Sequence, residues 1–190
     1  MGFGLQRLNI RMEQRKLWKK IHIIIKDKMM DYNIFKTEVH ELAVEKGWYD
    51  TPREIEELIL LVQSELFEAF ECWRNNDLRT RYESRKPCGL PSEFADMVIR
   101  FLDMAGYYNI IIKIPTEMEV FDLDDFKKWI FKINRLLCNH EYYFNSEFTN
   151  RLISEIENMA EYMKIDLELA IIEKHNYNKT RPYRHGNKLA

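Results

Sequence analysis

Glycine and proline are scarce in this chain, with 6 and 5 residues among 190. Together they occur at about half the frequency usual in globular proteins. β-Sandwiches, barrels and glycine-looped nucleotide-binding folds all need many tight turns, and these two residue types form most such turns. The scarcity therefore argues against these folds and favours long helices joined by few loops.

Length and composition predict one soluble globular domain over 1–190. A chain of this length can build one hydrophobic core but is short for two. With 46% hydrophobic and 32% charged residues, it is too apolar for a disordered chain and too charged for a membrane protein. No apolar run approaches the roughly 18 residues of a membrane span, and 1–20 lacks the continuous apolar segment of a secretory signal.

Cysteine usage indicates a reducing compartment. The chain has three cysteines, Cys72, Cys88 and Cys138, an odd number without close pairing. This pattern is typical of free or buried thiols rather than of a disulfide framework or a zinc site. We therefore expect a cytoplasmic protein.

Charge is distributed unevenly along the chain. The formal net charge is -2, but 1–30 carries +6 and 173–190 carries +4, which leaves -12 on 31–172. We expect a basic amphipathic arm over 1–31, because apolar residues recur there at helical spacing beside lysines (Leu17, Trp18, Ile21, Ile24 and Ile25). An acidic centre between basic ends suits a site where carboxylates gather metal ions and cations hold phosphates better than it suits a nucleic-acid backbone.

Apolar residues recur at intervals of three and four along most of the remaining chain, which predicts helices. We expect them over 35–46, from Pro52 to about Trp73, from about Pro91 to Ala105, and over 122–138, 146–163 and 166–178. Thr51 and Glu54 have the spacing of a capping box, with Pro52 at the first helical position. The isoleucines at 110–112 are interpreted as a helix end and loop, because Pro115 follows and no partner strand is evident. The predicted class is all-α, a helical bundle.

Two pairs of acidic residues lie beside the apolar faces of consecutive predicted helices. Glu65 and Glu68 are three residues apart, and Glu93 and Asp96 repeat this spacing, with Asp103 two turns further along. Antiparallel packing of the two helices would bring four or five carboxylates together. Such a cluster repels itself, and its oxygen ligands favour Mg²⁺ or Mn²⁺ over zinc. The alternative is that both pairs are solvated, since acid pairs at this spacing are common on exposed helix faces.

These acidic residues belong to a pattern that resembles a known family. Glu65-x-x-Glu68, 24 intervening residues and then Glu93-x-x-Asp96 are similar to the ExxE…ExxD signature of the MazG-like nucleoside triphosphate pyrophosphohydrolases. Further segments that look like members of this family are GWYD at 47–50, SELFEA at 64–69, KPCGLPSEFADMVIR at 86–100 and YNKTRPYRHG at 177–186. The resemblance covers about 35–112 and 165–188, and it implies an all-α nucleotide pyrophosphatase fold.

The resemblance also implies an activity. Members of the family hydrolyse a nucleoside triphosphate to the monophosphate and pyrophosphate, as house-cleaning enzymes, and form homodimers. Metal-binding positions of the family fall on Glu65, Glu68, Glu93 and Asp96, and either Glu65 or Glu68 is the candidate general base. Substrate phosphates are expected to bind at Lys174, Asn178 and Arg181; on composition alone, this segment is a solvated basic terminus.

The chain departs from compact members of the family in two places. It has the arm at 1–31, and between the metal-binding helices (35–112) and the C-terminal helix with its basic tail (164–190) it inserts a helical segment over 113–163. The inserted apolar stripes must be buried, either against the same chain's bundle or in a dimer interface. Trp48 and Trp73 are interpreted as core residues. The alternative function is a non-enzymatic helical adaptor or regulator whose basic arm binds a partner or nucleic acid.

Overall fold

The computed structural model describes residues 30–114, 125–138 and 144–187. The arm expected over 1–31 lies almost entirely outside these residues, and Tyr32–Ala190 forms a compact unit of its own. Its elements are α2 (Tyr32–Glu45), α3 (Ile55–Arg74), β1 (Arg81–Glu83), β2 (Lys86–Cys88), α4 (Leu90–Tyr107), α5 (Phe126–Cys138), α6 (Ser146–Tyr162), α7 (Leu167–Thr180) and the short α8 (Arg184–Asn187). The prediction of a mostly helical, all-α protein is confirmed. None of the described helices is both long and apolar enough to span a membrane.

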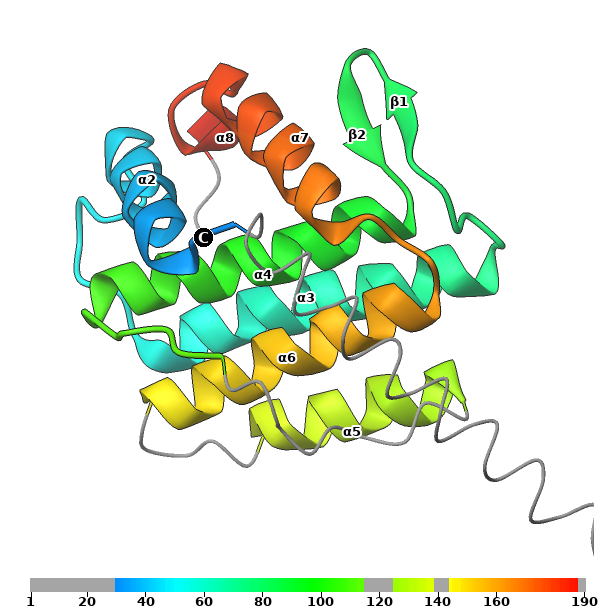
Figure 1. The fold of residues 1–190 in the computed structure, drawn as a ribbon. Coiled ribbons are helices and arrows are strands. Elements are labelled where there is room, and N and C mark those ends of the chain that lie inside the picture. Colours follow the sequence, from blue (N-terminus) through cyan, green and yellow to red (C-terminus); the bar gives the residue numbers. More distant parts are fainter. Residues whose placement is uncertain (1–29, 115–124, 139–143, 188–190) are drawn as a thin grey trace, which may run out of the picture. The chain divides into compact units, whose positions relative to one another are not determined.

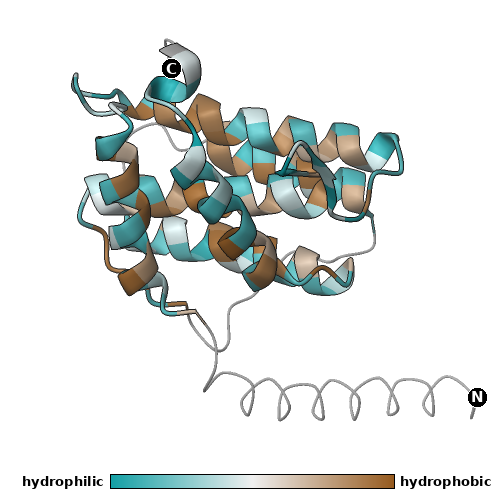
Figure 2. Ribbon diagram, turned by 90° about the horizontal axis from the view of Figure 1, so that it is seen from above, coloured by the Kyte–Doolittle hydropathy of each residue, from teal (hydrophilic) through white to brown (hydrophobic). Residues whose placement is uncertain are grey.

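Helix α4 is the centre of the unit. It packs against α2, α3, α6 and α7, and Figure 1 shows it (green) with α2 and α7 on one side and α6 on the other. Its largest apolar side chains, Phe94, Met97, Phe101 and Leu102, are fully buried. In Figure 2, hydrophobic and hydrophilic residues alternate around the turns of the helices, as expected where each helix turns one face to a shared core.

The start of α3 differs from the prediction. Thr51 does not cap the helix, which begins at Ile55 with Glu54 at the N-cap and no side-chain capping bond. The tertiary packing of Arg53 accounts for the difference: this buried side chain pairs with Glu57 at 2.5 Å and lies over the rings of Trp48 and Tyr49. Holding Arg53 in that place keeps 51–54 out of the helix. By contrast, the predicted cap at Asp166 is confirmed, because its Oδ1 accepts a hydrogen bond from the Leu169 amide at 3.1 Å.

A hairpin stands where only a loop was expected. Strands β1 and β2 pair antiparallel, with Arg81 opposite Cys88. The two residues that join them, Ser84 and Arg85, have φ values of 48° and 77°, the left-handed backbone of a tight two-residue turn. The expectation of no strands was wrong here. The strands were missed because both are short and β1 is entirely exposed, which leaves no alternation of apolar and polar residues to detect. The isoleucines at 110–112 lie in a loop, as predicted.

The inserted helices α5 and α6 cover the bundle of their own chain. Helix α5 packs on α3, and α6 packs on α4. The fully buried Trp129 of α5 lies 5.6 Å from the Phe94 ring of α4 and 5.8 Å from the Phe126 ring, measured between ring centroids. Of the two alternatives for the insertion, the structure shows the first: its apolar stripes thicken the bundle.

This packing predicts a large loss of stability for Trp129→Ala. Removing a fully buried aromatic side chain leaves a cavity and costs about 3–5 kcal/mol of unfolding free energy. Phe131→Ala is the matched control on the same helix, since Phe131 is 64% exposed, and it should change stability by less than about 0.5 kcal/mol. Urea unfolding measures both. Equal, small effects would show that α5 is not part of the core.

Candidate metal centre

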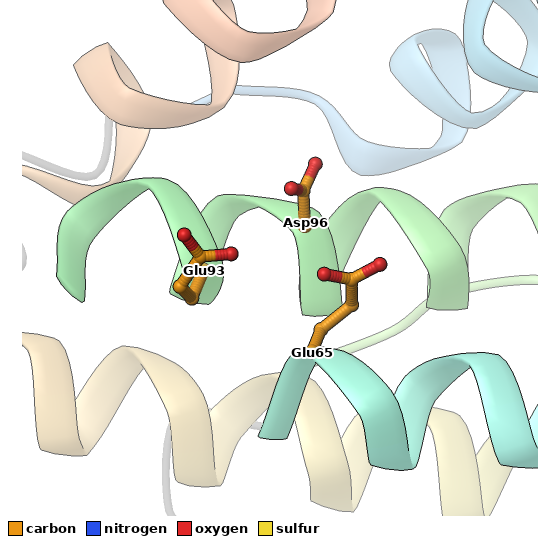
Figure 3. Close-up of side chains that lie close together, drawn as sticks. All are labelled: Glu65, Glu93 and Asp96. Atoms are coloured by element: carbon orange, nitrogen blue, oxygen red, sulfur yellow. The ribbon is translucent and has the colours of Figure 1, made fainter. Parts of the chain in front are cut away.

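Three carboxylates from α3 and α4 meet between these helices. The two helices run antiparallel, side by side (Figure 1). Glu65 on α3 faces Glu93 and Asp96, which are one turn apart on α4 (Figure 3). One ligand oxygen from each of the three lies within 4.8 Å of the others. The spacing of three residues within α4, together with antiparallel packing, therefore builds a compact group of oxygen donors.

The charges of these carboxylates are held close together in a poorly solvated place. Glu65 and Glu93 are each only 8% exposed. Burial, and then the negative charge of Asp96, raises the pKa of Glu93 to about 8 and also raises the pKa of Glu65. The carboxylates therefore strongly favour any arrangement that brings positive charge to them.

Two cations of the chain already lie against the cluster. The Lys174 Nζ from α7 lies 2.6 Å from an Asp96 oxygen and donates a hydrogen bond to the Ser92 hydroxyl at 2.8 Å. Burial lowers the pKa of Lys174, but the carboxylates, Asp96 first, raise it above its usual value. The Arg100 Nη2 lies 3.2 Å from a Glu65 oxygen. When all three carboxylates are ionised, as ligands of a metal ion would be, these two cations leave one negative charge uncompensated.

The chemistry of the donor set fits a hard divalent cation. All donors of the cluster are carboxylate oxygens, with no histidine or cysteine among them. Such a set suits Mg²⁺ or Mn²⁺, whereas zinc sites are usually built with nitrogen or sulfur. Glu65, Glu93 and Asp96 could hold the ion.

Two of the acidic residues considered in the sequence lie outside this group. Glu68 is exposed and is not one of the three converging residues, although its charge contributes to the raised pKa values of Glu65 and Glu93. It therefore lies at the rim of the cluster. Asp103 instead forms a pair with His40 of α2, with 2.8 Å between Oδ1 and Nδ1.

A cleft opens beside the cluster. Glu65 and Asp96 line it together with Asn178 and Arg181, from the end of α7 and the residue that follows it. The Asn178 Oδ1 is buried and has no hydrogen-bond partner within the part of the chain that the structure describes. Arg181 is half-buried, and no described carboxylate lies within ion-pair distance of its guanidinium. The residues predicted to bind substrate phosphates thus divide: Lys174 pairs with Asp96, whereas Asn178 and Arg181 face the cleft.

The cleft also contains residues that sequence analysis did not assign to the site. Trp48 was interpreted as a core residue, and it is buried, but it lines the cleft. Arg100 and Ser92 are in contact with the carboxylates or with Lys174. Arg100 follows Asp96 by four residues and so lies on the same side of the helix, and this spacing could have indicated from the sequence that Arg100 belongs to the site. Trp73, which was also interpreted as a core residue, is only half-buried, and its ring stacks on that of Phe126.

Comparisons with known proteins add no relative. No protein-family model, no curated protein and no solved structure matches this chain. The function is therefore inferred from the chemistry of the site and from the sequence motifs.

His175 is an unusual buried group in the wall of the cleft. Its side chain is 2% exposed, and among the described residues neither ring nitrogen has a hydrogen-bond partner. The ring packs edge-on against Phe35 of α2, with centroids 4.8 Å apart, and its Nε2 lies 4.0 Å from a Glu38 oxygen. Burial, and then the charge of Lys179, lowers the pKa of His175 to about 4.

The lowered pKa of His175 predicts a loss of stability in acid. The unfolded chain takes up this proton near pH 6.5 and the folded chain only near pH 4, so stability is lost as the pH falls between these values. The loss should reach about 2–3 kcal/mol at pH 4.5. Urea unfolding of wild type and His175→Gln at pH 7 and pH 4.5 isolates the effect, because other groups titrate in both proteins. Equal losses in the two proteins would contradict the prediction.

The carboxylate cluster predicts stabilisation by divalent cations. An ion that binds only the folded state should raise the unfolding free energy by about 2.7 kcal/mol at one hundred times its Kd. Thermal unfolding with and without Mg²⁺ or Mn²⁺ measures this shift, and Glu93→Gln should abolish it. Glu71→Gln on the exposed face of α3 is the matched control and should keep it. A shift that survives in Glu93→Gln would place the ion elsewhere.

Proposed function

We propose that this protein is a Mg²⁺-dependent nucleoside triphosphate pyrophosphohydrolase, which yields the nucleoside monophosphate and pyrophosphate. The observation that carries the proposal is the convergence of Glu65, Glu93 and Asp96 beside a cleft that is also lined by the half-buried Arg181, whose guanidinium forms no ion pair with a carboxylate of the described residues. Carboxylates on one side and cationic groups on the other match a metal-bound polyphosphate. The motifs shared with the MazG-like family support the same reaction.

The cleft separates two kinds of binding group. In the proposed complex, Glu65, Glu93 and Asp96 hold the cation, and the phosphates lie toward Arg181. The planar fork of an arginine suits phosphate oxygens, and Arg181 can bind them without first breaking an ion pair with a described carboxylate. Lys46 lines the same cleft, but its Nζ lies 3.4 Å from a Glu45 oxygen and donates to the Lys179 carbonyl at 3.0 Å. Lys174 has a different part, since its pairing with Asp96 orients that carboxylate.

The reaction needs a base beside the attacking water. What a divalent cation supplies when bound is neutralisation of phosphate charge and acidification of water. Glu65 and Glu68 are the two candidates for the base. We favour Glu68, because Glu65 is engaged by Arg100 and belongs to the donor group, whereas Glu68 lies at the rim and has no ion pair with the described residues. Its carboxylate would accept the proton of the water during in-line attack on phosphorus.

The remaining expectations from the resemblance belong to the same proposal. We propose that the fold is of the MazG-like, all-α nucleotide pyrophosphatase type and that the protein works in the cytoplasm as a homodimer. Leu60 and Phe67 on the outer face of α3 are 63% and 48% exposed, which is consistent with burial by a second copy.

Release of pyrophosphate tests the proposal. A panel of ribo- and deoxynucleoside triphosphates is incubated with Mg²⁺ or Mn²⁺, and pyrophosphate and the monophosphate are measured. Glu68→Gln should lower kcat about 10²–10⁴-fold, the usual contribution of a general base, while it keeps the stabilisation by metal. Glu93→Gln should lose both, and Glu71→Gln, one turn beyond Glu68, should lose neither.

Other results would point elsewhere. An active Glu68→Gln with an inactive Glu65→Gln would make Glu65 the base. Absence of pyrophosphate release from every nucleotide, together with absence of metal stabilisation, would contradict the proposal and favour the helical adaptor.

A further inference from the structure

Two of the sequence motifs, far apart in the chain, are in direct contact. The turn at 46–50 follows α2, and the turn at 181–186 follows α7. The Arg184 amide donates to the Lys46 carbonyl at 2.9 Å, and its Nε donates to the Gly47 carbonyl at 3.0 Å. The Tyr183 hydroxyl donates to the Asp50 carboxylate. We call this contact the clasp, meaning residues 46–50 and 181–186.

Glycine is required at the centre of the clasp. Gly47 has a φ of +79°, a left-handed conformation that side chains other than glycine rarely adopt. A Cβ atom at this position would also overlap the ring of Tyr183. The two segments therefore approach so closely that Tyr183 occupies the space of the missing side chain.

The backbone of 181–186 is held in an unfavourable shape. Arg184 and His185 have φ values of 43° and 48°, and Gly186 follows at 95°. Consecutive left-handed residues persist only where surrounding contacts determine them. Those contacts come from the other half of the clasp, including the His185 ring, which meets Trp48 edge-on with centroids 5.1 Å apart.

Arg181 is the residue at which the chain passes from α7 into the clasp. Helix α7 ends at Thr180, and the Arg181 amide still donates to the Asn178 carbonyl at 3.1 Å, but the Arg181 backbone is extended, so its side chain lies beyond the last helical turn. With the clasp formed, Arg181 and His185 line the cleft that contains Glu65 and Asp96. Each contact of the clasp lies outside the carboxylate cluster, so the clasp can be altered without changing a metal ligand.

We propose that Gly47 and Tyr183 are positioning residues whose contact fixes the C-terminal turn and thereby places Arg181 in the cleft. The part that concerns substrate rests on the proposed function, in which Arg181 binds the phosphates. Tyr183 neither belongs to the cluster of Glu65, Glu93 and Asp96 nor lines the cleft; it acts through Arg181.

The first experiment measures whether the clasp holds the turn, independently of activity. Trypsin cleavage after Arg184 is followed by mass spectrometry. Tyr183→Ala should be cleaved at least about tenfold faster than wild type, because cleavage requires local opening. Tyr183→Phe keeps the ring over Gly47 and should stay within about threefold of wild type. Tyr183 is 50% exposed, so its truncation leaves the core intact, and stabilisation by Mg²⁺ should be unchanged.

The second experiment measures the consequence for substrate. Tyr183→Ala should raise KM for the hydrolysed nucleotide about tenfold with kcat nearly unchanged, the effect of losing one charge-assisted contact. Arg181→Ala should have a similar effect. The double variant should be no worse than Arg181→Ala alone, because both changes remove the same interaction. Gly47→Ala should resemble Tyr183→Ala.

The outcomes separate the inference from the proposed function. Unchanged cleavage of Tyr183→Ala would overturn the clasp itself. Faster cleavage with an unchanged KM, or additive effects of the two variants, would overturn the positioning of Arg181. If wild type hydrolyses no nucleotide, the proposed function fails and the substrate part of the inference fails with it, while the cleavage rates still decide whether the clasp holds the turn.

Discussion

Burial of like charges between α3 and α4 is the constraint on which the rest of the unit depends. Glu65, Glu93 and Asp96 lie within a few ångströms of one another at the edge of the core, where water compensates them poorly. Such a cluster is tolerated only if cations are brought to it. The chain brings two: Arg100 on α4 itself and Lys174 from α7. The requirement for compensation thus links three helices.

The position of α7 follows from this link. Lys174 is 3% exposed and pairs with Asp96, so a displaced α7 would separate the lysine from its carboxylate. Because α7 is fixed in this way, the residues after it are carried to the turn at 46–50. One side of the cleft is therefore held by the ion pair between Lys174 and Asp96. The other side is held by the contacts between 46–50 and 181–186.

The sequence predicted those features that depend on local periodicity. The apolar spacing located α3 through α7 to within a few residues, and the spacing of Glu93 and Asp96 placed both on one side of α4. Features determined by distant contacts were missed. The start of α3 depends on Arg53 packing against Trp48 and Tyr49, which no local capping rule includes.

The candidate site shows the same division between features set by local spacing and features set by distant contacts. Antiparallel packing was expected to gather four or five carboxylates, but rotation of α3 leaves Glu68 at the rim, and His40 of α2 pairs with Asp103. Trp48 fits the pattern of a core residue and is buried, yet it also borders the cleft. One-dimensional spacing indicates the face of a helix; it does not indicate which neighbouring element covers that face.

The clasp has a consequence for the order of folding. Its bond from the Arg184 side chain to the Gly47 carbonyl spans a sequence separation of 137 residues, whereas α3 and α4 are neighbours along the chain. Long-range closure costs entropy before any contact compensates it. The helical bundle can therefore form first, and the clasp closes on a core already built. In the native state we expect the reverse order, with the amides of 181–186 exchanging with solvent before those of α4, because a contact that closes last on a finished core can open without unfolding it.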